Sequence, residues 1–174
     1  MKLKSIVSVM ACSMLFAGSV FAADEGSGTV KFEGSIIDAP CSISASTQNQ
    51  IIPMGAISNK SIYSKDGKLK SNFTIKLEDC TVATKKNVTI TFSGAAKDGL
   101  LALEGTTKGA GIQIDDSYGV PMVLGTASAA VPMLAGENDL KFNAYLKPIS
   151  AAASADDIQP GNFTATVTFT LNYL

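Results

Sequence analysis

The thiols of three cysteines, Cys12, Cys41 and Cys80, are the groups in this sequence best suited to covalent chemistry. Cys12 lies within residues 1–22, which have the pattern of a secretory signal peptide: a basic start, an apolar run, and small residues before a predicted cut after Ala22. A retained membrane anchor and lipid attachment at Cys12 are the alternatives. An exported chain would keep two cysteines, which pair in most such proteins. We therefore predict a disulfide between Cys41 and Cys80.

Catalytic and metal chemistry have little support in the sequence. The chain has no histidine, so the commonest general base is missing, and two cysteines do not fill the ligand sphere of zinc. The acid pairs Asp115-Asp116 and Asp156-Asp157 lack calcium-loop spacing, and neighbouring residues on a strand point to opposite sides. The glycines of residues 109–111 are interpreted as a turn or bulge. We predict no catalytic, metal-binding or cofactor-binding residues and no enzyme activity.

The charge balance argues against several classes of partner. All 14 basic residues are lysines, against 15 acidic residues, and removal of residues 1–22 would make the chain mildly acidic. No basic patch for nucleic acid is visible, and we predict neither a nucleic-acid partner nor a small-molecule substrate. Four Asn-x-Ser/Thr sequences are interpreted as a chance product of threonine-rich strands, with glycosylation as the alternative. They begin at Asn59, Asn72, Asn87 and Asn162.

Apolar residues recur at every second position through most of the chain, which is the period of a β-strand. The clearest segments are 73–77, 88–92, 112–114 and 140–146. Turn signals separate them, at 65–67, 97–99, 135–138 and 160–161. Residues 150–157 are alanine-rich but lack an apolar stripe, and are interpreted as a loop with room for one helical turn. The pattern predicts an antiparallel, all-β sandwich.

Residues 161–174 show the most regular alternation. One parity is apolar, and it consists of Phe163, Ala165, Val167, Phe169, Leu171 and Tyr173, following Gly161. The other parity is polar, and it consists of Asn162, Thr164, Thr166, Thr168, Thr170 and Asn172. This predicts one long strand with one apolar face. Such a strand needs a partner, because unpaired strand edges invite the addition of another strand.

A shorter segment near the other end of the chain alternates in the same way. Gly28, Val30 and Phe32 share one parity, while Thr29, Lys31 and Glu33 share the other. The residues before them, 23–29, are small and polar, with little to bury. We therefore expect a flexible extension at 23–34 that ends in a strand, followed by one compact domain at 35–174. Two such terminal strands suggest a module that exchanges strands with its neighbours.

Three separated motifs resemble those of fimbrial subunits assembled by the chaperone–usher route. Residues 28–34 (GTVKFEG) and 36–41 (IIDAPC) resemble the start of these subunits, and 73–80 (FTIKLEDC) resembles their second cysteine motif. The third motif is a glycine fourteenth from the end, Gly161, followed by apolar alternation and a penultimate tyrosine, Tyr173. The resemblance covers the whole chain after the predicted signal peptide. Two-domain tip adhesins are longer, so the chain is similar to a structural pilin.

The resemblance implies an incomplete immunoglobulin-like sandwich, completed by a donor strand from a neighbouring subunit. A periplasmic chaperone would fill the open groove first, and the extension of the next subunit would replace it at an outer-membrane usher. The donor residues would be Gly28, Val30 and Phe32, and the groove strand would be the apolar parity from Gly161 to Tyr173.

We therefore interpret the chain as a structural subunit of a bacterial surface fimbria, exported through the periplasm and supporting adhesion through the fibre. The alternatives are a minor or tip-proximal subunit, a secreted sugar-binding β-sandwich module, or a complete sandwich with a frayed N-terminus. A sugar site would be unusual, because the chain has no tryptophan and only 4 tyrosines to stack on sugar rings.

Overall fold

The computed structural model describes residues 28–64 and 69–174. The predicted signal peptide (1–22), the start of the extension (23–27) and the predicted turn at 65–67 lie outside the described residues. The chain divides into two units, residues 1–36 and residues 37–174. In the first unit, residues 28–36 carry no helix or strand.

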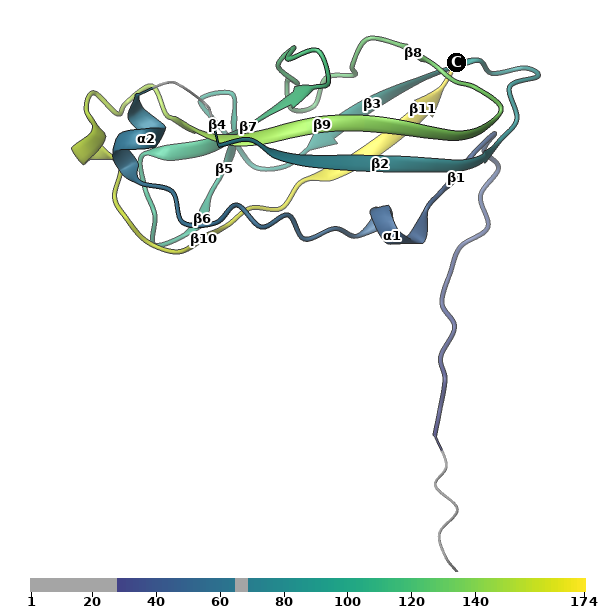
Figure 1. Ribbon diagram of the computed structural model, residues 1–174, viewed down its shortest axis with the longest axis horizontal. Helices are drawn as coiled ribbons and strands as arrows, with labels where there is room; N and C mark the ends of the chain where they lie inside the picture. The colour runs from purple at the N-terminus through teal and green to yellow at the C-terminus, as the bar shows by residue number, and fades with distance from the viewer. Residues whose placement is uncertain (1–27, 65–68) are drawn as a thin grey trace, which may run out of the picture. The chain divides into compact units, whose positions relative to one another are not determined.

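The second unit is built almost entirely from antiparallel strands arranged in three sheets (Figure 1). The six-stranded sheet has the order β1 (Ser42–Ile43), β2 (Ser71–Cys80), β9 (Gly136–Pro148), β7 (Ala110–Asp116), β5 (Leu100–Ala102) and β4 (Ala96–Lys97). The three-stranded sheet has the order β11 (Thr168–Tyr173), β3 (Asn87–Ser93) and β8 (Val131–Pro132). A third sheet pairs β10 (Phe163–Thr164) with β6 (Glu104–Gly105). The antiparallel all-β prediction is confirmed.

Within residues 28–64 and 69–174, helical structure is limited to three short pieces, α1 (Ala45–Gln48), α2 (Asn59–Tyr63) and the 3₁₀ turn η1 (Ala155–Asp157). The last of these is the single helical turn for which the sequence had room. Its capping box joins the Asp157 carboxylate to the backbone N–H and hydroxyl of Ser154. Within the described residues, no helix is long and apolar enough to cross a membrane.

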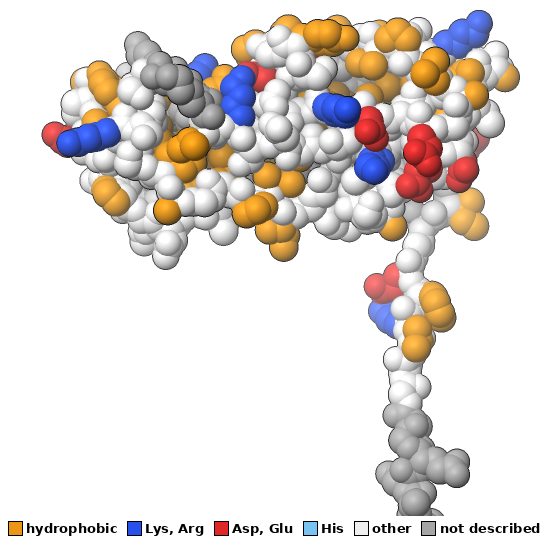
Figure 2. Space-filling model, in the orientation of Figure 1, with side chains coloured by type: hydrophobic (Ala, Val, Ile, Leu, Met, Phe, Trp, Pro, Cys, Tyr) orange, Lys and Arg blue, Asp and Glu red, His pale blue; other side chains and the backbone are white. Residues whose placement is uncertain are grey.

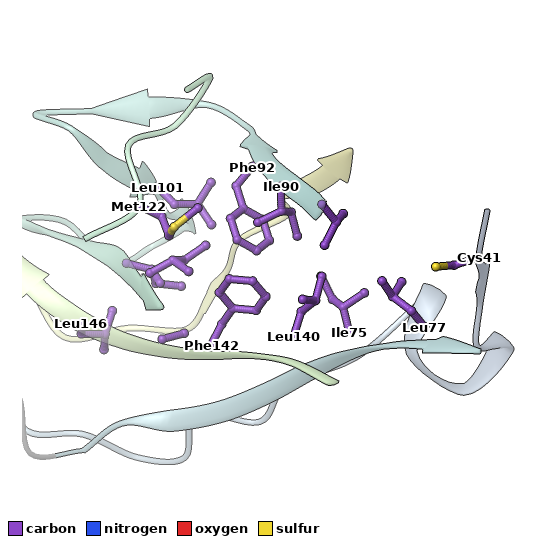
Figure 3. Close-up of a cluster of buried hydrophobic side chains, with 14 of the residues drawn as sticks. Cys41, Ile75, Leu77, Ile90, Phe92, Leu101, Met122, Leu140, Phe142 and Leu146 are labelled. Atoms are coloured by element: carbon purple, nitrogen blue, oxygen red, sulfur yellow. The ribbon is translucent and has the colours of Figure 1, made fainter. Parts of the chain in front are cut away.

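The hydrophobic core lies between the six-stranded and the three-stranded sheet (Figure 3). Phe92 of β3 meets Phe142 of β9 edge-on at 5.0 Å between ring centroids, and Phe73 of β2 stacks on Phe142 at 5.4 Å. Ile75 and Leu77 of β2 are completely buried beside them. Inward-facing residues of two sheets thus interdigitate as in a β-sandwich.

The strands predicted at 73–77, 88–92, 112–114 and 140–146 are confirmed as parts of β2, β3, β7 and β9. The prediction of a single strand through residues 161–174 is wrong in one respect. Residues 165–167 belong to no ladder, and they separate β10 from β11. The reason is that β3 ends at Ser93, so the chain before Thr168 loses that partner and pairs instead with β6.

Candidate functional site

The edge strand β11 is the first component of the site. It pairs with β3 from Thr168 opposite Ser93 to Tyr173 opposite Val88, and the strand order places it at the margin of its sheet. On its other side, no strand of the described residues pairs with it. Its backbone groups on that side are therefore available to an additional strand.

Burial along residues 161–174 follows the parity that the sequence predicts, but no side chain in this segment is fully buried. From Phe163 to Tyr173 the apolar side chains of one parity are all half-buried, whereas the other parity, polar from Asn162 to Asn172, is exposed, as is the terminal Leu174. The apolar set packs on the core cluster without being enclosed by it. Half-burial of every member indicates that these side chains line an open surface.

A groove of about 1390 Å³ runs beside the first part of this segment, as far as Phe169. One wall is formed by residues 158–167 with Phe169, and the other by residues 47–59. The floor consists of core side chains of both sheets, among them Phe73, Phe92 and Ile114. Figure 2 shows hydrophobic side chains reaching the surface between α1 and α2, where the second wall runs. The domain thus has a long apolar groove between two extended chain segments.

The second wall was not identified from the sequence. Ile52, Met54 and Ile57 are half-buried, and Met54 and Ile57 pack against the core, although residues 50–58 form neither helix nor strand. The signal that could have found them is the apolar spacing of Ile52 and Met54. It is interrupted by Pro53 and Gly55, which are typical of irregular segments.

Gly161 is required by close packing where the groove strand begins. A Cβ at this position would collide with the Thr106 side chain and lie 3.0 Å from the Thr107 backbone nitrogen. The close approach is held by two hydrogen bonds: Asn162 N–H donates to Thr106 Oγ1 at 3.2 Å, and Thr106 N–H donates to the Asn162 carbonyl at 3.1 Å. Gly161 therefore lets this segment lie against the chain next to β6.

The other end of the groove strand is anchored by backbone hydrogen bonds. The Leu174 carbonyl accepts from the N–H groups of Lys86 and Asn87, at 2.8 and 3.1 Å. Beside it, the Tyr173 hydroxyl is buried without a hydrogen-bond partner among the described residues. Burial raises the pKa of Tyr173 above its ordinary value of 10.0. The penultimate tyrosine is thus partly enclosed, while the strand edge next to it stays free.

The predicted donor residues lie in the first unit and are almost fully exposed. Val30 is 75% and Phe32 is 91% accessible, and a Cβ at Gly28 would have nothing within 4 Å. Lys31 and Glu33, on the opposite parity, form an ion pair with each other. This segment therefore has one apolar side and one side whose two opposite charges cancel.

The predicted disulfide between Cys41 and Cys80 is present in the structure. Cys41 stands just before β1 and Cys80 ends β2, and both are buried. The bond therefore fixes the start of the domain to the sheet that supports the second wall of the groove.

The acidic pairs form no shared site. Asp115 is buried with Lys70 Nζ 3.7 Å from its carboxylate, whereas Asp116 Oδ1 accepts from the N–H groups of Tyr118 and Val120 in a turn. Asp157 caps η1, and hydrogen bonds from the Ser154 backbone and side chain lower its pKa. In the described parts of the chain, no three His, Cys, Asp or Glu side chains gather as metal ligands would.

An all-β sandwich with an open groove beside its edge strand is the architecture of a strand-accepting module. Residues 30–174 match the family model described as "Fimbrial protein". The major MR/P fimbria protein of Proteus mirabilis (strain HI4320) is 44% identical over 178 residues, which cover 99% of each chain. The fimbria A protein of Serratia marcescens is 42% identical over 176 residues, again covering 99% of each. The chain belongs to the fimbrial protein family.

Solved structures agree with this assignment. The crystal structure of the P pilus rod subunit PapA has a TM-score of 0.66 and 28% identity, covering 78% of this chain and 100% of that one. A chaperone–usher pilus structure concerned with rod uncoiling has a TM-score of 0.72 and 30% identity, covering 86% and 97%. The fold is the incomplete immunoglobulin-like sandwich of these subunits, and the protein is a structural subunit of a surface pilus.

Proposed function

We propose that the groove accepts residues 28–34 of a second copy, or of a related subunit, so that each subunit completes the sandwich of its neighbour. The observation that carries this proposal is the half-burial of every apolar residue from Phe163 to Tyr173, of which those up to Phe169 line an open groove. An added strand would satisfy the free edge of β11 and would cover these side chains.

The extension has the features of such a strand. Val30 and Phe32 are exposed and share one parity, so both would enter the groove together, while Lys31 and Glu33 would stay outside as a neutral pair. Each buried Val or Phe side chain contributes about 1.5–3 kcal/mol. Residues 23–34 would reach about 40 Å when extended, which matches the length of the strand from Gly161 to Tyr173 at ~3.3 Å per residue.

An exposed groove of this kind also needs an occupant before assembly. We infer that a periplasmic chaperone supplies a temporary strand and that an outer-membrane usher hosts its replacement. Export would follow cleavage of the signal peptide after Ala22. The chain's role is structural rather than catalytic, and any adhesion would be a property of the fibre.

Deletion of residues 23–32 tests the proposal directly. The truncated chain keeps its groove, so a chaperone should still hold it, but it cannot donate a strand to another subunit. Produced with its chaperone and usher, it should form no surface fibres and no heat-sensitive ladder in SDS. The matched control replaces Lys31 and Glu33 with Ser, which changes only the outward side and should preserve fibres. Normal fibres built from the truncated chain alone would overturn the proposal.

A further inference from the structure

The edge of β2 beyond β1 carries an unusual set of hydrogen bonds. β1 is short, and it pairs only Ser42 and Ile43 with Glu78 and Leu77. Along the rest of β2 toward its start, no strand of the described residues covers this side. The sheet therefore has a second edge close to the groove, and an unprotected edge would compete for any incoming strand.

Two side chains occupy this edge in place of a strand. Thr47 Oγ1 accepts from the Lys76 N–H at 3.1 Å, and it donates to the Ser44 carbonyl at 3.2 Å. The Gln50 amide nitrogen donates to the carbonyls of Thr47 and Thr74, at 2.8 and 2.9 Å. Thr47 is buried, and Gln50 is half-buried. These contacts occupy the Lys76 N–H and the Thr74 carbonyl, two backbone groups that a competing strand would need.

The same residues stand where the second wall of the groove begins. The chain follows β2 as far as the bond from Ser44 N–H to the Lys76 carbonyl, at 3.0 Å, and continues as the wall through Ile52 and Met54. Gln50 uses both of its amide hydrogens to hold the start of this wall to β2. It thereby helps to set where the wall stands relative to β11.

Resting on the proposed function, we propose that Thr47 and Gln50 are positioning residues for strand addition. They close the edge of β2, and they hold the second wall so that the groove beside β11 is the place where a donor strand binds. Neither residue needs to contact the donor strand, because each acts through the backbone of β2 and of the wall.

Two variants remove the hydrogen bonds of Gln50 and Thr47 while keeping the size and shape of each side chain. Gln50→Glu keeps the size of the side chain but replaces the amide donor by carboxylate oxygens facing two carbonyls. Thr47→Val keeps the shape of the side chain but removes the hydroxyl that accepts the hydrogen bond from the Lys76 N–H. Thr47→Ser restores that hydroxyl and should rescue binding. Ala45→Glu is the control for charge, because Ala45 is exposed on α1, does not line the groove, and the substitution adds the same negative charge.

The probe is a fluorescent peptide of residues 23–34, titrated into the whole chain with its disulfide formed. The wild-type chain, Ala45→Glu and Thr47→Ser should bind it with similar affinity. Gln50→Glu and Thr47→Val should bind about tenfold more weakly, which corresponds to about 1.4 kcal/mol. Because general destabilisation also lowers affinity, hydrogen exchange must locate the bound peptide.

Hydrogen exchange of the Lys76 amide distinguishes a positioning role of Thr47 from a general loss of stability. In the wild-type chain this amide should be protected with or without peptide, since Thr47 accepts its hydrogen bond. In Thr47→Val it should exchange rapidly alone and should become protected when peptide is added, as strands begin to add to β2. A destabilised fold would instead lose protection throughout the sheet.

The outcomes are distinct. Unchanged affinity in both variants, with peptide-dependent protection confined to β11, would overturn this inference and leave the proposed function standing. Failure of the peptide to bind the wild-type chain would overturn the proposed function and this inference with it. If Thr47→Val does not fold, the affinity of Gln50→Glu compared with that of Ala45→Glu decides the question.

Discussion

Two adjacent strands of the same sheet, β3 and β11, have the same apolar alternation but differ in burial. The inward side chains of β3 are at most 3% exposed, whereas those of β11 are all half-buried. They lie directly opposite one another: Phe92 with Phe169, Ile90 with Leu171, and Val88 with Tyr173.

The difference arises from the neighbours of each strand. On its far side β3 has β8 and the segment after β7, with Gly125 N–H donating to the Phe92 carbonyl and Ser128 N–H to the Ile90 carbonyl, both at 2.8 Å. β11 has β3 on one side and no strand of the described residues on the other, and its Phe169 lines the groove. Alternation therefore reports which face of a strand is apolar, while burial reports whether the described part of this chain covers that face.

The largest expected effect comes from a charge on the apolar parity. Val167→Asp would place a carboxylate in the filled groove without a partner, at a cost of several kcal/mol, and should abolish recovery of the subunit from the periplasm. Thr168→Asp is the matched control, because Thr168 is exposed on the opposite parity. Immunoblots of periplasmic extracts would measure both. Equal accumulation of the two variants would contradict the assignment of faces.

Truncation of Phe92 and of Phe169, which lie opposite each other on β3 and β11, should show the difference in burial between the two strands as a difference in stability. Phe92→Ala should destabilise the domain by about 3–5 kcal/mol whether or not the groove is filled. Phe169→Ala should cost clearly less in the free subunit, and it should approach the Phe92→Ala value when a peptide of residues 23–34 is bound. Urea unfolding with and without the peptide measures both. If Phe169→Ala lowers the free energy of unfolding by the same amount with and without the peptide, the groove is not the peptide's site.

The two glycines of the terminal segments should respond in opposite ways. Gly161→Ala should destabilise the free domain by roughly 1–3 kcal/mol, because its Cβ would press on Thr106 and Thr107. Gly28→Leu should leave that stability unchanged, since Gly28 has open space around it. It should nevertheless prevent fibre growth if Gly28 enters a narrow part of the neighbour's groove. Thermal unfolding and electron microscopy would score the two variants, and fibres of normal length from Gly28→Leu would exclude that packing.

The smallest effects concern two tyrosines. Burial, followed by the hydrogen bond and negative charge of Asp115, raises the pKa of Tyr145 to about 12 from the ordinary 10.0. Because the folded state holds this proton more tightly, its contribution to stability should be complete below pH 10 and should decline between pH 10 and 12. Tyr145→Phe should flatten that decline, as measured by urea unfolding at each pH. An unchanged pH dependence would contradict the effect.

Tyr173, the last residue of β11, also has a raised pKa. Burial alone raises it, and a donor strand along β11 would bury the side chain further. Its tyrosinate absorbance, obtained by difference from Tyr173→Phe, should appear at higher pH when the peptide of residues 23–34 is bound. A shift to lower pH on binding would contradict coverage of this end of β11 by the peptide.

Much of this molecule could be predicted from local pattern. The alternation in β2, β3, β7 and β9, the faces of residues 161–174, and the pairing of Cys41 with Cys80 each depend on residue type or spacing. The second wall could not be predicted, because Pro53 and Gly55 interrupt its periodicity and its position depends on contacts to β2. The break at residues 165–167 depends on where β3 ends, which lies far away in the sequence.

The contacts of Thr47 and Gln50 could not be predicted from the sequence either. Their side chains bind backbone groups of β2, which carry no sequence signal of their own. The donor role of residues 28–34 remains a prediction, because it concerns contacts between subunits rather than within this chain.

The central claim is that residues 28–34 of one subunit lie beside β11 of the next. Residues directly opposite on neighbouring antiparallel strands have Cα atoms about 4.5–5.5 Å apart, which lies within the range of about 4.4–6.8 Å that a disulfide spans. Lys31→Cys can therefore be combined in turn with a cysteine at Thr164, Thr166, Thr168 or Thr170, in fibres assembled on cells. The account predicts that one combination gives ladders that survive boiling in SDS and collapse on reduction. Normal fibres in which none of the four combinations cross-links would contradict it.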